Sequence, residues 1–255
     1  MKESWHNYKD KYKRFCRFNQ EEWKIIIIVS LVFAFILSFN KWGETSFDII
    51  IGLKNFLISL IIVAPSVYVH EMGHRLHAIL IGFRAETRIW WYGLWGGLLL
   101  CVLTGGSVTI YAATSVWVHH LAYHRFGFFR YGPNLLSIGL ISLSGPLLGL
   151  FYGTFLKTLA LILPMPLFLF NFIHQIFVFN IVMAAWNLLP IPPLDGSRTF
   201  FQSRLTYSFV AGSIVSYALM VTLFGYYSYI AALLLGGVIW LIFYITVERA
   251  QIESR

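Results

Sequence analysis

The chain has 255 residues, of which 58% are hydrophobic and only 12% are charged. Soluble domains usually carry about 25% charged residues, so this composition excludes an ordinary soluble globular protein. The formal net charge of +8 could indicate nucleic-acid binding. However, basic residues are concentrated in the first 24 positions, ahead of the first long apolar run. Such a cluster is typical of the cytoplasmic flank of a membrane protein, and we expect no nucleic-acid partner.

Six apolar segments are long enough to cross a lipid bilayer as helices, which takes roughly 20 residues each. They cover residues 23–39, 56–83, 134–163, 168–189, 206–224 and 229–247. Six spans place both termini on one side of the membrane, and the bias of basic residues makes that side the cytoplasm. Three lysines would then lie towards the other face: Lys41, Lys54 and Lys157. We expect residues 1–24 to form a cytoplasmic segment and residues 25–255 to form one membrane-embedded domain.

Residues 84–133 form the least regular part of the sequence. Gly-Gly pairs at 96–97 and 105–106 separate stretches rich in β-branched and aromatic residues, a pattern typical of strands. We expect strands or a hairpin that dips into the membrane and is buried against protein, because a lipid-exposed strand edge leaves backbone groups unpaired. An irregular helix near residues 98–103 is the alternative. The predicted fold is an all-α polytopic membrane protein with about six transmembrane helices and a small membrane-associated β element after the second helix.

One carboxylate lies inside a predicted transmembrane helix. Glu71 belongs to the sequence V-H-E-M-G-H-R-L-H-A, and an ionisable side chain at membrane depth costs at least a few kcal/mol. Residues 70–74 match H-E-x-x-H, in which His70 and His74 share one helix face and can bind one metal ion. Glu71 can then act as the general base towards a water molecule on that metal. The pattern predicts a hydrolytic metal site within the membrane.

A catalytic zinc site needs three protein ligands and one open position. The candidate third ligand is Asp195, near the end of the sequence N-L-L-P-I-P-P-L-D-G at residues 187–196. The prolines end or distort the fourth predicted helix, so Asp195 would follow a cytoplasmic helix end close to the histidine pair. Alone, P-L-D-G indicates an ordinary turn. Beside an H-E-x-x-H sequence in the membrane, a metal ligand is the better interpretation.

The two sequences H-E-M-G-H and N-L-L-P-I-P-P-L-D-G resemble the paired signatures of the site-2 protease family of intramembrane metalloproteases. Between them, S-G-P-L-L-G at residues 144–149 resembles the family's G-P motif, although Gly149 stands where many relatives have Asn. The resemblance covers about residues 56–200 and implies a three-helix catalytic core. PDZ and CBS domains, which some relatives carry, are absent from the sequence. The chain therefore resembles a short form of the family, and we expect an archaeal type.

The resemblance implies one Zn²⁺ per chain, with His70, His74 and Asp195 as ligands and Glu71 as the general base. It also implies that Asn187 hydrogen-bonds the substrate backbone or the developing oxyanion, a role suited to a preorganised donor. Capping of a broken helix end is the alternative role for Asn187. The implied substrates are single-span membrane proteins cleaved within or near their transmembrane helix, and the β element would hold the unwound substrate.

Several alternatives remain open from the sequence. His77 could replace one ligand, but an interfacial polar residue is the simpler interpretation. Among the functions, a metal-ion transporter would need polar residues along a path through the bilayer, whereas here they gather at one depth. A non-catalytic relative that only binds membrane proteins would usually lack a ligand or Glu71. His174, in the fourth predicted span, is interpreted as a helix-packing residue. The H-H-x-x-x-H cluster of His119, His120 and His124 is interpreted as interfacial, and a second metal site there is the less favoured alternative.

Overall fold

The computed structural model describes residues 5–43, 47–121, 134–224 and 229–249. Within these ranges, five helices contain segments long and apolar enough to cross a membrane. They are α3 (Ile49–Leu80), α5 (Leu135–Ile162), α6 (Leu167–Asn187), α8 (Arg204–Phe224) and α9 (Tyr229–Phe243), the last continuing as a π-helical turn over Tyr244–Glu248. The expected polytopic helical fold is therefore confirmed.

The first predicted span forms helix α2 (Gln20–Ser38), which follows the short helix α1 (Trp5–Phe15). Helix α2 has 19 residues, but Glu21, Glu22 and Lys24 lie near its start, so it is not among the five apolar helices. The other predicted spans match their helices closely, except that α3 begins at Ile49 and not at residue 56.

Side-chain caps determine where these helices begin. Asn19 accepts a hydrogen bond from the backbone N–H of Glu22, whose carboxylate accepts one from the N–H of Asn19. This capping box starts α2. The carboxylate of Asp48 accepts hydrogen bonds from N–H groups in the first turn of α3, and Asn134 caps α5 in the same way. Each cap satisfies a backbone donor that a helix start leaves unpaired.

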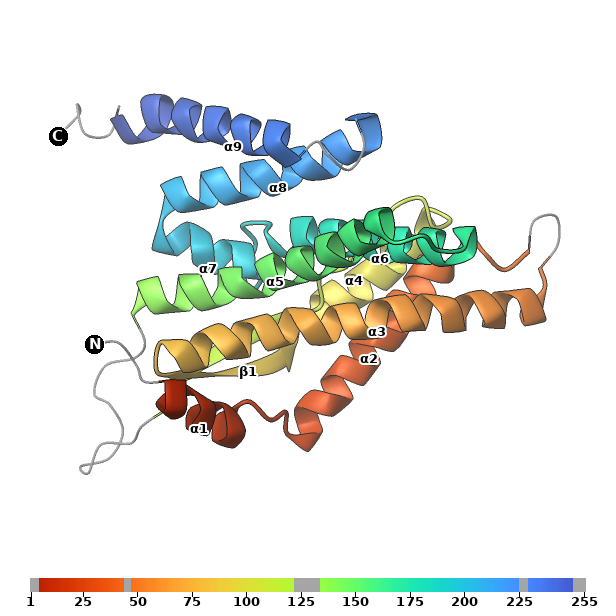
Figure 1. Ribbon diagram of the computed structural model, residues 1–255, viewed down its shortest axis with the longest axis horizontal. Coiled ribbons are helices and arrows are strands. Elements are labelled where there is room, and N and C mark those ends of the chain that lie inside the picture. Colours follow the sequence, from red (N-terminus) through yellow and green to blue (C-terminus); the bar gives the residue numbers. More distant parts are fainter. Residues whose placement is uncertain (1–4, 44–46, 122–133, 225–228, 250–255) are drawn as a thin grey trace.

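Helices α3, α5 and α6 pack together as the centre of the molecule. In Figure 1, α8 and α9 form a layer on one side of α5 and α7 (Asp195–Gln202), and α1 and α2 lie on the opposite side of α3. The largest buried apolar cluster joins α2, α3 and α6, with Val29, Ile62 and Phe179 among its members. The central helices are thus packed against one another and against α2.

The segment after α3 contains two antiparallel strands, β1 (Phe83–Ile89) and β2 (Thr114–His120), with Thr87 opposite Val116. On one face of this sheet, Ala85 and Val116 pack against Ala78 of α3 and Ile141 of α5. The expected β element is present, and it is buried against the helices that carry the H-E-x-x-H and G-P sequences.

The connection between the strands differs from the predicted hairpin, because residues 91–103 form helix α4. The helical alternative was therefore right for this part. In α4, Gly93 and Gly97 face the carbonyl oxygens of Ala112 and Ile110, and an added Cβ would lie 2.3 and 3.0 Å from them. These glycines allow close approach of a neighbouring segment. The second Gly pair does form a turn, since Gly105 and its neighbour have φ angles of 59° and 78°.

Candidate active site

The two histidines of the H-E-x-x-H sequence lie one turn apart on α3 and are both buried. Their Nε2 atoms are 3.3 Å apart. Helix α5 approaches α3 closely here because Gly73 of α3 faces α5 and Gly145 of α5 faces α3. An added Cβ on Gly73 would lie 2.6 Å from the carbonyl oxygen of Ser144, and one on Gly145 would lie 2.3 Å from the ring of His74. The G-P sequence thus provides the space that the histidine ring occupies.

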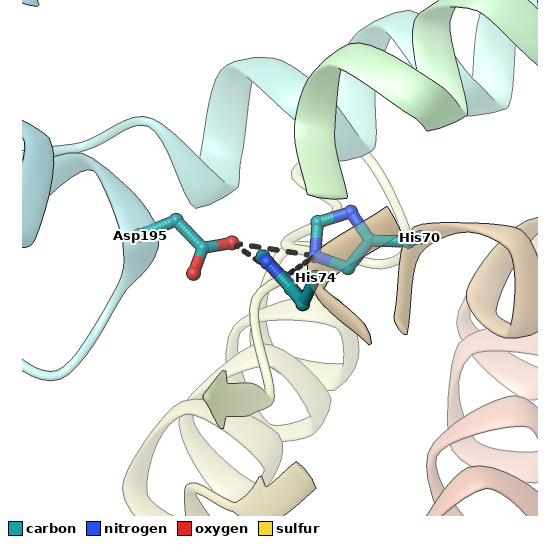
Figure 2. A group of neighbouring side chains, drawn as sticks. All are labelled: His70, His74 and Asp195. Carbon is teal, nitrogen blue, oxygen red and sulfur yellow. Dashed lines mark hydrogen bonds and ion pairs between the residues drawn. The ribbon is translucent and has the colours of Figure 1, made fainter. Parts of the chain in front are cut away.

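Asp195 is the first residue of α7 and reaches the same point from the opposite side. Its Oδ2 lies 3.3 Å from Nε2 of His70 and 3.3 Å from Nε2 of His74. Figure 2 shows the carboxylate and both imidazoles converging. The chain turns tightly between α6 and α7, since a Cβ on Gly196 would lie 2.0 Å from the carbonyl oxygen of Leu188. The Pro-rich sequence before Asp195 therefore redirects the chain as expected.

The three converging atoms fit a zinc ion. Tetrahedral zinc with bonds of about 2.0–2.1 Å to nitrogen and oxygen separates its ligand atoms by about 3.3–3.4 Å. The three observed separations are all 3.3 Å. Nδ1 of His74 lies 2.8 Å from the carbonyl oxygen of Ile141, so it carries the proton and leaves Nε2 free to bind metal. These three residues are the metal-binding candidates within the described part of the chain.

The electrostatics of Asp195 suit a ligand that must be ionised. Burial raises the pKa of this carboxyl, but the charges and hydrogen bonds of His74 and His70 outweigh that effect and lower the pKa well below its usual range. Its second oxygen, Oδ1, is buried and has no hydrogen-bond partner among the described residues. Asp195 therefore stays an anion at neutral pH, as metal binding requires.

Glu71 follows the first histidine and is almost completely buried. The hydroxyl of Thr87, on strand β1, donates a hydrogen bond of 2.7 Å to Oε2 of Glu71. Its other oxygen, Oε1, is buried and has no partner within the described residues. Burying a carboxylate oxygen without a hydrogen-bond donor costs free energy, and a functional role is one explanation for such a group. Glu71, next to the candidate ligand His70 in the sequence, therefore has one oxygen held by Thr87 and one oxygen without a donor among the described residues.

Comparison with known proteins gives one relative. A protein of Methanocaldococcus jannaschii described as a candidate zinc metalloprotease is 29% identical over 203 residues, which are 80% of this chain and 95% of that protein. A match over 80% of the chain must include its middle part, where the H-E-x-x-H, G-P and P-L-D-G sequences lie. This similarity is consistent with a site-2 protease-like family. No family model and no solved structure matches it.

Asn187 is the last residue of α6 and is buried. Its side-chain amide donates hydrogen bonds to the carbonyl oxygens of Met183, one turn earlier, and Tyr111, in the segment before β2. Its Oδ1 has no partner among the described residues. These contacts favour the alternative role at a helix end, and the substrate-binding role stays a prediction.

The other histidines weighed from the sequence lie outside the metal-binding group where the structure describes them. His77 is half-buried on α3, and His174 on α6 lies beside the ring of Phe177. His119 lies 3.6 Å from the carboxylate of Glu86, and His120 contacts the ring of Phe83. His124, the third histidine of the predicted cluster, lies outside the described residues.

Four contributors to the site's surroundings were not predicted from sequence. Thr87 contacts Glu71, and Arg198 of α7 donates to the carbonyl oxygen of Val116. Arg75 and Glu22, expected on the cytoplasmic flank, form an ion pair and are each only 2% exposed. A signal existed for one of them, because Arg75 directly follows a ligand in a buried helix and needs a partner there.

Proposed function

We propose that this chain is a zinc-dependent intramembrane metalloendopeptidase that hydrolyses a peptide bond within or near the transmembrane helix of a single-span membrane protein. The observation that carries the proposal is the buried convergence of His70, His74 and Asp195 beside Glu71. Two imidazole nitrogens and a carboxylate oxygen directed at one point are explained when a cation binds all three.

The roles of the protein's residues follow from this arrangement. His70, His74 and Asp195 would hold zinc, which supplies a Lewis acid able to lower the pKa of a bound water to about 7. Glu71 accepts a proton from the attacking water at its free Oε1. The new C–O bond forms at the peptide carbonyl, the C–N bond breaks, and Glu71 returns the proton to the leaving amine nitrogen.

The substrate must be extended before it is cut, because a helix hides its peptide bonds in its own hydrogen bonds. The outer edge of β2 suits this task. Thr87 and Val116 lie directly opposite each other in the two strands. The N–H of Thr87 bonds the side chain of Glu22, and the carbonyl oxygen of Val116 accepts from Arg198. The two residues therefore form a non-hydrogen-bonded pair, whose backbone groups point away from the partner strand. Along β2 the outward positions are then residues 114, 116, 118 and 120. An unwound substrate added there as a strand would replace its lost backbone hydrogen bonds.

The edge of β2 borders the candidate metal site. Arg198, one turn after Asp195 on α7, bonds the carbonyl oxygen of Val116. A substrate strand would therefore pair beyond this point or displace the guanidinium of Arg198. This contact supports the placement of substrate next to Asp195.

The decisive experiment compares wild type with Glu71→Gln in a cleavage assay on a panel of single-span substrates. The variant keeps all three ligands but loses the base, so we expect zinc content to stay at the wild-type level while the rate falls about 10²–10⁴-fold or more. Zinc is measured by metal analysis of the same purified samples. Cleavage by Glu71→Gln at the wild-type rate would contradict the proposed mechanism.

A further inference from the structure

We infer that Thr87 is a positioning residue for Glu71, an inference that rests on the proposed function. Thr87 belongs to none of the sequence motifs that carry the metal site. Yet its hydroxyl lies 2.7 Å from Oε2 of Glu71, and the side chains of both residues are buried. An ionised carboxylate can only accept hydrogen bonds, so Thr87 is the donor.

This hydrogen bond selects which oxygen of Glu71 can react. The terminal torsion of a glutamate side chain has a broad, roughly two-fold preference, so packing alone fixes it poorly. Thr87 binds Oε2, and Oε1 has no partner among the described residues. The carboxylate plane is thereby set, and the oxygen left free is the one that can take a proton.

Thr87 is itself held in place from outside the site. Its backbone N–H donates a hydrogen bond of 3.0 Å to Oε1 of Glu22, in the first turn of α2. The same oxygen is paired with Arg75, which lies on α3 one residue after the ligand His74. A β-branched side chain has few χ1 rotamers, so fixing the backbone of Thr87 also fixes its hydroxyl.

The contacts form a continuous path from α2 through β1 to the base on α3. Glu22 closes it at the other end, because its Oε2 accepts the N–H of Asn19 in the capping box. The links among Arg75, Glu22, Thr87 and Glu71 are between buried groups, where a hydrogen bond is electrostatically stronger and an unpaired group is costly. Precise placement matters here because a shift of about 1 Å in a catalytic group can cost about 100-fold in rate.

The test uses Thr87→Val, which has nearly the same shape but no donor, and Thr87→Ser, which keeps the donor. The matched control is Thr206→Val, since Thr206 is half-buried on α8 and its hydroxyl bonds the hydroxyl of Ser203 and not Glu71. For each protein, kcat, KM and bound zinc are measured on the same sample. We also measure the thermal unfolding temperature of the zinc-free protein for Thr87→Val, Glu71→Gln and the double variant.

We expect Thr87→Val to lower kcat about 10–100-fold, the usual cost of removing a supporting contact, with KM and zinc content unchanged. Thr87→Ser should recover most of the lost rate, and Thr206→Val should behave as wild type. In the zinc-free proteins, the unfolding-temperature shifts of Thr87→Val and Glu71→Gln should not add in the double variant, because both act on the same hydrogen bond. Thr87→Val removes its donor, and Glu71→Gln replaces its charged acceptor with a neutral one.

Some results would overturn the inference and leave the proposed function intact. The first is a wild-type kcat in Thr87→Val while Glu71→Gln is inactive. The others are an equal loss of rate in Thr87→Ser or Thr206→Val, loss of zinc in Thr87→Val, or additive unfolding-temperature shifts. Failure of the proposed function looks different, because wild type and Glu71→Gln would then cleave alike.

Discussion

His74 is the most constrained of the three candidate ligands. Its Nδ1 faces the carbonyl oxygen of Ile141, and its ring lies against the position where Gly145 lacks a side chain. Both constraints come from α5, the helix of the G-P sequence. His70 lacks an equivalent contact, since its Nδ1 has no partner among the described residues. The three candidate ligands are thus constrained to different degrees. Helix α5 orients His74, and the turn before α7 orients Asp195.

At the residue scale, Asp195→Ala should lower both zinc occupancy and cleavage. Its carboxylate supplies one of three ligand atoms, and two histidines alone leave the site one ligand short. Zinc content of the purified protein, measured beside the cleavage rate, tests this expectation.

Asp48→Ala is the control for Asp195→Ala, because it removes a carboxylate that only caps α3. Loss of a cap costs about 0.5–2 kcal/mol of stability. We expect zinc to stay bound in this variant. Equal zinc content in Asp195→Ala and wild type would exclude Asp195 as a ligand and favour His77 instead.

The sequence was sufficient to predict the candidate ligands and the base because each lies in a short pattern. The spacing of His70 and His74 follows from one helical turn, and Asp195 follows a Pro-rich stop. Thr87 and Glu22 could not be found this way. Thr87 reaches Glu71 from a strand, and Glu22 meets Thr87 across 65 positions of sequence. Contacts of this kind depend on how the elements pack, which local patterns do not specify.

At the element scale, the buried ion pair of Arg75 and Glu22 joins α3 to α2. Arg75 also donates to the carbonyl oxygen of Arg17 and lies over the ring of Phe18 at 3.9 Å. Both side chains are shielded from bulk water, so each charge is compensated mainly by the other. The basic residue that charge distribution placed on the cytoplasmic flank is therefore part of the protein interior.

Arg75→Met should destabilise the fold strongly. Removing one member of a buried pair leaves the other charge uncompensated and typically costs about 3–5 kcal/mol. Arg75→Lys should cost less, because the charge remains although the planar donor geometry is lost. The free energy of unfolding in detergent measures both effects.

Arg14→Met is the matched control for Arg75→Met. Arg14 pairs with Asp10 on α1 at 3.1 Å, but both side chains are more than half exposed. Exposed pairs contribute about 0–1 kcal/mol. Similar unfolding free energies for Arg14→Met and Arg75→Met would show that the α2–α3 pair contributes no more than a surface contact.

The same scale shows where sequence patterns were ambiguous. Long apolar runs between polar or proline-rich breaks predicted α5 and α6 almost to the residue. Helix α4 was harder, because its aromatic and glycine-rich sequence is compatible with a strand. Its glycines serve the approach of residues 110 and 112, and this packing became visible only in the folded chain.

For the whole molecule, the candidate metal site lies near one end. Helix α3 has 32 residues and is about 48 Å long at 1.5 Å per residue. His74 precedes its last residue, Leu80, by six positions, or about 9 Å. At the same end in Figure 1 lie α1, α7 and the C-terminal end of α9. Lys41 precedes α3 and Lys157 lies near the end of α5, so both belong to the opposite end.

The last prediction concerns where in the membrane the substrate is cut. If basic residues mark the cytoplasm, the metal site lies in the cytoplasmic half of the bilayer. A substrate helix should then be cut in its cytoplasmic half, as determined by mass spectrometry of both products. Sidedness is tested independently with Lys9→Cys and Lys41→Cys, which replace exposed residues, while the native Cys16 and Cys101 are buried. A membrane-impermeant thiol reagent outside intact cells should label Lys41→Cys alone. Labelling of Lys9→Cys alone, with cuts in the opposite half, would reverse the orientation and leave the chemistry of the site unchanged.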